Sequence, residues 1–185
     1  MAVEQKRMTY SEFEQFIAAP ENRDRRFELI NGEIVEVSPN KTHGRIAHFI
    51  SGMLFVYLRQ NPIGFVDLEA RYKMPLDNHN AVMPDLAFTS IEREDPDLKT
   101  GVIPQMPDLA VEIKSPNDSY VGMRDKAAYY ISNGARMVWL IYPEKRLIDV
   151  YRQGADLQIL NEHEIFDGGD VLPGFTLPVR EVFDV

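Results

Sequence analysis

The residues from 107 to 114 (PDLAVEIK) alternate apolar and polar side chains with the period of a β-strand. Successive side chains of a strand point to opposite faces, so aliphatic and charged residues separate. The aliphatic face holds Leu109, Val111 and Ile113, and the charged face holds Asp108, Glu112 and Lys114. Glu112 and Lys114 are expected to stand roughly 7 Å apart, because a strand rises about 3.3 Å per residue. A charged row on a probable core strand indicates a functional site.

The remaining pattern predicts helices and short strands along the whole chain. The Asn31-Gly32 pair, between two short apolar runs, is a strong hairpin signal. Apolar residues spaced three and four apart predict an amphipathic helix over 43–60. Three helices are predicted: one that begins near Thr9, one over 43–60 and one over about 118–133. The predicted strands are the two of the hairpin at 27–37, followed by 65–74, 81–89, 107–114, 136–142, 147–152 and 157–164, before a Gly/Pro-rich tail.

This order of elements indicates the fold class. Strands 107–114 and 136–142 enclose a helix, and such a βαβ unit makes a right-handed parallel crossover. The neighbouring strands follow one another too closely for parallel pairing throughout. We therefore expect an α/β (α+β) fold with a mixed central β-sheet flanked by helices and accessory β-hairpins. With 185 residues, the chain is expected to form one domain over 1–185.

Composition narrows the function classes. The chain has no cysteine, which excludes disulfides and thiolate metal sites. No apolar run approaches the ~20 residues of a membrane span, and the N-terminus lacks the apolar core of a signal peptide. We expect a soluble cytoplasmic protein. The net charge of −9 argues against a simple nucleic-acid binder.

The charge is unevenly distributed along the sequence. Residues 154–185 contain seven acidic residues and one arginine, so the rest of the chain is only mildly acidic. Basic clusters occur at 23–26, 41–45, 71–73 and 124–126. If a homo-oligomer, a dimer in the first instance, gathers the first three clusters around one cleft, the protein can bind DNA despite its acidity.

Carboxylates at the ends of two predicted strands favour a metal-dependent hydrolase. Mg²⁺ is usually held by one or two carboxylates together with water and substrate oxygens. Asp85 and Glu112 are the expected ligands, with the Ile113 carbonyl as a further one. Lys114 is expected to orient the attacking water or stabilise developing charge. Glu28 is a candidate third acid in the same pocket.

The order Glu28, Pro84-Asp85 and Pro107 to Pro116 (PDLAVEIKSP) resembles the PD-(D/E)XK nuclease superfamily, most closely its Uma-type branch of restriction-endonuclease-like proteins. The similarity covers nearly the whole chain. It implies a Mg²⁺- or Mn²⁺-dependent DNA endonuclease with Asp85 and Glu112 as metal ligands, Lys114 as the catalytic lysine and Glu28 as an accessory acid. Many members of this branch use a lysine on the following helix, which corresponds to Lys126 here. The intact motif makes Lys114 the preferred candidate, with Lys126 in reserve.

Other interpretations remain open at several positions. Asp108 is expected to be a strand-start residue rather than a ligand, and His43 fits helix capping or packing as well as catalysis. Of Tyr129 and Tyr130, one is expected to be buried and the other exposed. The acidic balance also leaves a second function possible, in which the fold is a weakly active or inactive module for protein interaction or regulation.

Overall fold

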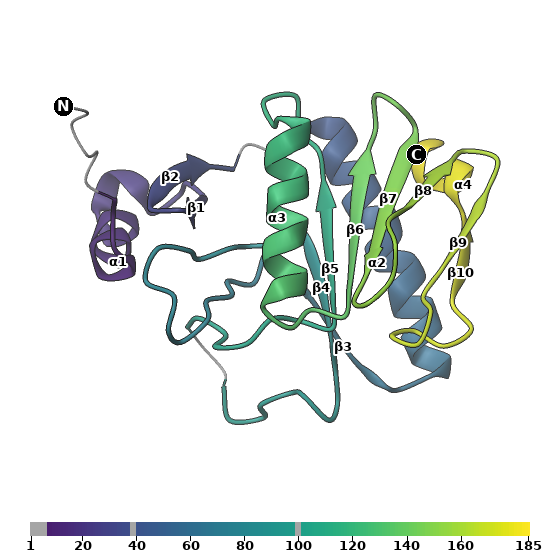
Figure 1. Ribbon diagram of the computed structural model, residues 1–185, viewed down its shortest axis with the longest axis horizontal. Helices are drawn as coiled ribbons and strands as arrows, with labels where there is room; N and C mark the ends of the chain where they lie inside the picture. The colour runs from purple at the N-terminus through teal and green to yellow at the C-terminus, as the bar shows by residue number, and fades with distance from the viewer. Residues whose placement is uncertain (1–6, 38–39, 99–100) are drawn as a thin grey trace.

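The structure is a computed structural model that describes residues 7–37, 40–98 and 101–185. Its elements follow the predicted order (Figure 1). The helices are α1 (Tyr10–Ala18), α2 (Lys41–Gln60), α3 (Tyr120–Ser132) and α4 (Val179–Phe183), with a 3₁₀ turn at Pro20–Asn22. The strands are β1 (Phe27–Ile30), β2 (Glu33–Glu36), β3 (Gly64–Leu68), β4 (Leu86–Ser90), β5 (Leu109–Ile113), β6 (Met137–Tyr142), β7 (Leu147–Arg152), β8 (Gln158–Asn161), β9 (Ile165–Asp167) and β10 (Thr176–Pro178).

Six strands form the central sheet in the order β3-β4-β5-β6-β7-β8. β5 and β6 pair in parallel through the α3 crossover, and the other neighbours in this sheet pair antiparallel. The predicted βαβ unit and the mixed sheet are therefore confirmed. Among the described residues, no helix is long and apolar enough to cross a membrane.

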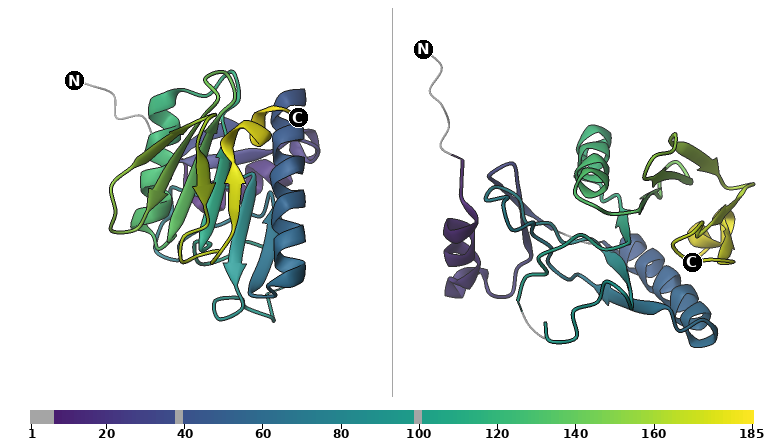
Figure 2. Two further views of the ribbon diagram at one scale, coloured as in Figure 1. Left: turned by 90° about the vertical axis from the view of Figure 1, so that its right-hand side faces the viewer. Right: turned by 60° about the horizontal axis from the view of Figure 1, so that its bottom comes forward.

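The two faces of the sheet are covered by different helices. α2 and α3 lie on opposite sides of it (Figure 2). Alternation along β5 sends Val111 and Ile113 into the aliphatic core with α2, and Ala110 into the core with α3. Glu112 therefore faces the α3 side, where Tyr130 donates a hydrogen bond to it. This strand register places a carboxylate inside the protein.

The β1–β2 hairpin and α1 form a separate layer beside the sheet (Figure 1). Asn31 and Gly32 both have positive φ, as the predicted Asn-Gly turn requires. Leu29 and Ala81 exchange backbone hydrogen bonds of 2.9 and 2.8 Å. These bonds hold the hairpin against the segment that leads into β4, so Glu28 lies next to that segment.

Two sequence predictions need correction, and one segment for which no element was predicted proves to be regular. The predicted strand over 65–74 ends at Leu68, and the one over 81–89 is regular only from Leu86. Pro84 interrupts the second strand, because proline has no N–H to donate to a sheet ladder. The Gly/Pro-rich tail is also not irregular. It forms the β9–β10 hairpin and α4, and its Phe166 and Phe175 pack on Trp139.

Candidate active site

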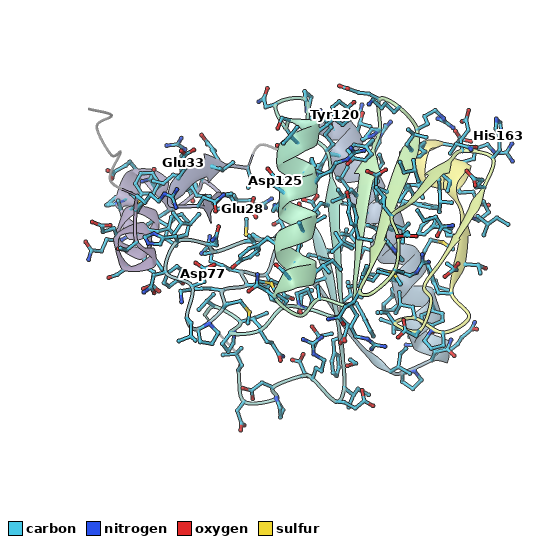
Figure 3. All side chains as sticks on the ribbon, viewed as in Figure 1. Glu28, Glu33, Asp77, Tyr120, Asp125 and His163 are labelled. Carbon is cyan, nitrogen blue, oxygen red and sulfur yellow. The ribbon has the colours of Figure 1, made fainter. Side chains whose placement is uncertain are left out.

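Seven Asp, Glu and Lys side chains line one cavity of about 430 Å³. Four of them come from β1, the start of β4, β5 and α3 and form the candidate site, namely Glu28, Asp85, Glu112 and Lys126. Figure 3 shows Glu28 between the N-terminal hairpin and α3. Glu28 and Glu112 are only 4% and 5% exposed, so their charges must be compensated by neighbouring groups.

Lys126 provides that compensation for both glutamates. Its Nζ lies 2.8 Å from Glu28 Oε2 and 2.8 Å from Glu112 Oε1. The second oxygen of Glu28 accepts the Met83 backbone N–H at 2.5 Å. Glu112 Oε1 also accepts the Tyr130 hydroxyl at 2.7 Å. Both glutamates are thus fixed in position by specific donors.

Asp85 is held from two sides at the end of β5. Its Oδ2 accepts the Ile113 backbone N–H at 2.7 Å, and its Oδ1 lies 3.1 Å from His43 Nε2. Pro84 explains this arrangement, since the β4–β5 ladder begins only at the Leu86–Val111 pair. Beyond that pair, the aspartate side chain takes over a hydrogen bond that the strand backbone would otherwise make.

The charges in the cavity do not balance. Six carboxyl groups and one ammonium group line it, and only Glu28 and Glu112 contact the ammonium. Burial, opposed by Lys126 but reinforced by Glu28 and Asp85, raises the pKa of Glu112 to about 8. Burial lowers the pKa of Lys126, but Glu112 and Glu28 outweigh it and raise that pKa well above its usual value. Lys126 is therefore firmly protonated, and the cavity keeps an excess of negative charge.

Negative charge near the cavity also raises the pKa of His43. Burial disfavours its charged form, but the hydrogen bond and charge of Asp85 outweigh burial and raise the pKa of His43. His43 lies in the first turn of α2, where its backbone N–H also donates to the Asn40 cap at 2.9 Å. The residue thus joins the start of α2 to Asp85, a contact that the sequence had not indicated.

Asp85 and Glu112 are the carboxyl groups of this cavity that could hold a hard divalent cation, and Ile113 also lines it. Within the described ranges no three His, Asp or Glu side chains are arranged as a complete ligand set. Mg²⁺ does not require one, because it commonly keeps several waters and takes one or two carboxylates.

Lys114 does not join this group. Its Nζ donates to the Ser115 carbonyl at 3.0 Å and lies 5.1 Å from the ring centroid of Tyr120. Tyr120 stands at the N-terminal end of α3 (Figure 3). Lys114 lines a separate cavity of about 250 Å³ that includes Asn40 and Thr42. Lys114 thus does not line the cavity that contains Glu112, because β5 ends at Ile113 and the lysine ammonium donates to a neighbouring carbonyl.

The sequence had not assigned Tyr130 to the site. It is fully buried, whereas Tyr129 is partly buried and donates to Asp77 at 2.9 Å. Tyr130 follows Lys126 by four residues, which places both on one helix face. That spacing is the sequence signal that would have connected the two residues.

Asp108 lies at the opposite end of β5 and belongs to another network. It is fully buried and accepts the Ser90 backbone N–H at 2.8 Å and Arg93 Nη1 at 2.9 Å. Burial raises its pKa, but these donors outweigh burial and lower the pKa below the usual value. Asp108 is thus a structural carboxylate at the start of the strand.

Comparison with known proteins identifies the family and the fold of the chain. Residues 11–180 match the model of the Uma2 family, which is described as "Putative restriction endonuclease". A crystal structure from Anabaena variabilis ATCC 29413, described as a putative nuclease belonging to DUF820, superposes with a TM-score of 0.81 at 20% sequence identity. The match covers 96% of this chain and 98% of that one. It confirms the expected restriction-endonuclease-like fold. No curated protein matches the sequence significantly.

Proposed function

The chain belongs to the Uma2 family of restriction-endonuclease-like proteins, and we propose that it is a metal-dependent endonuclease that hydrolyses DNA phosphodiester bonds. The observation that carries the proposal is the convergence of Asp85, Glu112 and Lys126 on one cavity. Asp85 and Glu112, with the Ile113 carbonyl, would hold Mg²⁺ or Mn²⁺. The ion would act as a Lewis acid toward phosphate oxygens and lower the pKa of a bound water.

We assign the lysine role to Lys126 rather than Lys114. Its ammonium contacts Glu112 directly, whereas the Lys114 ammonium faces another cavity. The raised pKa of Lys126 means that it does not act as a base at neutral pH. Its role is to stabilise negative charge that develops on the phosphate, as preorganised cations do in such sites.

Glu28, Tyr130 and His43 are positioning residues in this scheme. Glu28 holds the ammonium of Lys126 from the side opposite Glu112. Tyr130 fixes one oxygen of Glu112. His43 fixes one oxygen of Asp85. Such partners orient the ligating groups before the substrate arrives.

The test combines metal binding with DNA cleavage. Calorimetric titration with Mn²⁺ should show binding to the wild type that Asp85→Asn and Glu112→Gln both lose, since each change keeps the shape but removes a charge. Lys126→Met should abolish cleavage of plasmid DNA, and the matched Lys114→Met should retain it. Binding or cleavage that survives Asp85→Asn and Glu112→Gln unchanged would contradict the proposal.

One observation favours a second candidate, a non-catalytic module. Lys126 bridges Glu28 and Glu112, so the network can serve stability alone. The net charge of −9 also opposes strong unaided DNA binding. Wild-type protein that binds neither Mn²⁺ nor DNA would favour this candidate.

A further inference from the structure

The outward face of α2 has a charge distribution unlike the rest of the molecule. The helix contains no aspartate or glutamate in its 20 residues, although the chain as a whole carries a net charge of −9. Its inward face packs on the sheet through Ile46, Ile50 and Leu54. The opposite face is exposed and presents Lys41, Arg45, His48 and Arg59.

These basic residues differ from most others in having no acidic partner. Within residues 7–37, 40–98 and 101–185, no ion pair or side-chain hydrogen bond involves Lys41, Arg45 or Arg59. Seven other arginines are paired with carboxylates, namely Arg25, Arg26, Arg93, Arg124, Arg136, Arg146 and Arg152. In the cluster at 23–26 two of the three arginines are thus paired, and in the cluster at 71–73 Arg71 and Lys73 donate to backbone carbonyls, whereas Lys41 and Arg45 on α2 are exposed.

The spacing of the basic residues forms a continuous stripe. Positions 41, 45, 48, 52 and 59 fall on one side of a helix with 3.6 residues per turn. Lys41 and His48 lie about 10 Å apart along the axis at 1.5 Å per residue. That length corresponds to roughly three phosphates of one DNA strand at about 3.4 Å per step.

Two glycines lower the surface along this stripe. An added Cβ at Gly44 or Gly52 would meet nothing within 4 Å, so neither glycine is required by packing inside the protein. Glycine within a helix costs backbone entropy, and it often marks a close approach of another chain. A phosphate backbone can approach the helix axis more closely here than over larger side chains.

The stripe begins where α2 meets the candidate active site. Lys41 is the first residue of the helix, and His43, two residues later, contacts Asp85 in the cavity. A nucleic acid whose scissile phosphate enters the cavity would therefore pass the N-terminal end of α2.

We propose that the outward face of α2, from Lys41 through Arg45 and His48, binds the phosphate backbone of the DNA that flanks the cleaved bond. The proposal rests on the proposed nuclease function for the identity of its ligand. Charge complementarity selects DNA as the occupant, because an unpaired basic stripe on an acidic protein matches a polyanion. The exposed Phe55 and Val56 further along the helix make a second copy of the chain the competing occupant.

The experiment measures binding of a labelled duplex oligonucleotide by fluorescence anisotropy, in EDTA to prevent cleavage, from about 50 mM to about 200 mM salt. Each phosphate contact contributes about 0.9 to the slope of log K against log salt. Lys41→Gln/Arg45→Gln should therefore reduce the slope by about 2 and weaken binding roughly fiftyfold at about 0.1 M salt.

The single variant Arg45→Gln is compared with a matched control, Arg152→Gln. Arg152 pairs with Asp167 and opposes Met137, at the end of the sheet away from the cavity. Both variants lose one charge, so a general effect of net charge would weaken DNA binding equally. We expect Arg45→Gln to reduce the slope by about 1 and Arg152→Gln to leave it nearly unchanged.

Three results would overturn the inference. The first is an unchanged salt slope in the double variant, and the second is the absence of wild-type DNA binding at the lowest salt. The third is a shift of the double variant from dimer to monomer in sedimentation with DNA binding unaltered, which would make the face an interface between copies of the chain. Mn²⁺ titration of the same variants separates this failure from failure of the proposed function, since the stripe variants should retain metal binding whereas Asp85→Asn should not.

Discussion

Lys126→Met should destabilise the protein far more than Lys114→Met, although both remove one ammonium group. Without Lys126, Glu28 and Glu112 lose their common cation inside the protein. Removing one partner of a buried ion pair typically costs about 3–5 kcal/mol. Lys114 interacts with a carbonyl and an aromatic face, and its loss should cost about 1–2 kcal/mol.

The loss of unfolding free energy in Lys126→Met should also depend on pH, and the titration of Glu112 determines whether it grows or shrinks as the pH rises. Burial raises the pKa of Glu112 to about 8 in the presence of Lys126, and loss of the cation must raise it further. A carboxyl group whose pKa is raised on folding penalises the folded state at high pH, and protonation removes that penalty. Below about pH 8 Glu112 is protonated in both folded proteins and contributes no difference between them, so this part of the destabilisation should appear above about pH 8 and grow as the pH rises.

Urea denaturation of the wild type and both variants at several pH values measures these differences. The slope of unfolding free energy against urea should stay constant, which shows that stability alone has changed. A loss for Lys126→Met no larger than that for Lys114→Met would refute the reasoning. So would a loss that stays the same at all pH values.

Three further predictions concern other parts of the structure. Asp108→Asn should lower the free energy of unfolding by about 3 kcal/mol near neutral pH. The variant should also lose less stability than the wild type below about pH 5, because the Asp108 carboxyl group, whose pKa is lowered in the fold, stabilises the fold only while it is ionised. Acid titration followed by circular dichroism measures both effects. Tyr130→Phe should weaken Mn²⁺ binding about tenfold to a hundredfold by releasing one oxygen of Glu112, as measured by calorimetry, and unchanged affinity would contradict the positioning role. Gly64→Ala should destabilise by about 1–3 kcal/mol, since its Cβ would lie 2.2 Å from a backbone oxygen, whereas Gly52→Ala on the exposed helix should stabilise by about 0.5–1 kcal/mol; thermal melts of the two variants should shift in opposite directions.

The sequence predicted the parts of the fold that depend on local signals. The Asn31-Gly32 turn, the helix that begins after Thr9, where a Thr9–Glu12 capping box forms, and the end of α3 near residue 133 all agree with the sequence predictions. Each depends on a few neighbouring residues whose conformational preferences are strong. The alternation along β5 was sufficient to place Glu112 opposite the aliphatic core.

The parts that failed depend on long-range contacts. The β9–β10 hairpin is short, and its stability comes from packing on Trp139, which is distant in the sequence. The segment before β4 resembles a strand but is held by isolated bridges to β1 and to Tyr72. Local patterns contain no information about either partner.

The choice between the two lysines shows why a motif in the sequence does not define a site. Alternation along β5 places Glu112 and Lys114 on the same side, but strand rise separates them by roughly 7 Å. Lys126 reaches within 2.8 Å of Glu112 because α3 crosses over that side of the sheet. The crossover therefore brings a helix lysine to the carboxylate more closely than the strand can bring its own. Because α3 supplies Lys126 to Glu112, Lys114 at the end of the strand can line a different cavity. The contrast between Lys126→Met and Lys114→Met tests this division of roles directly.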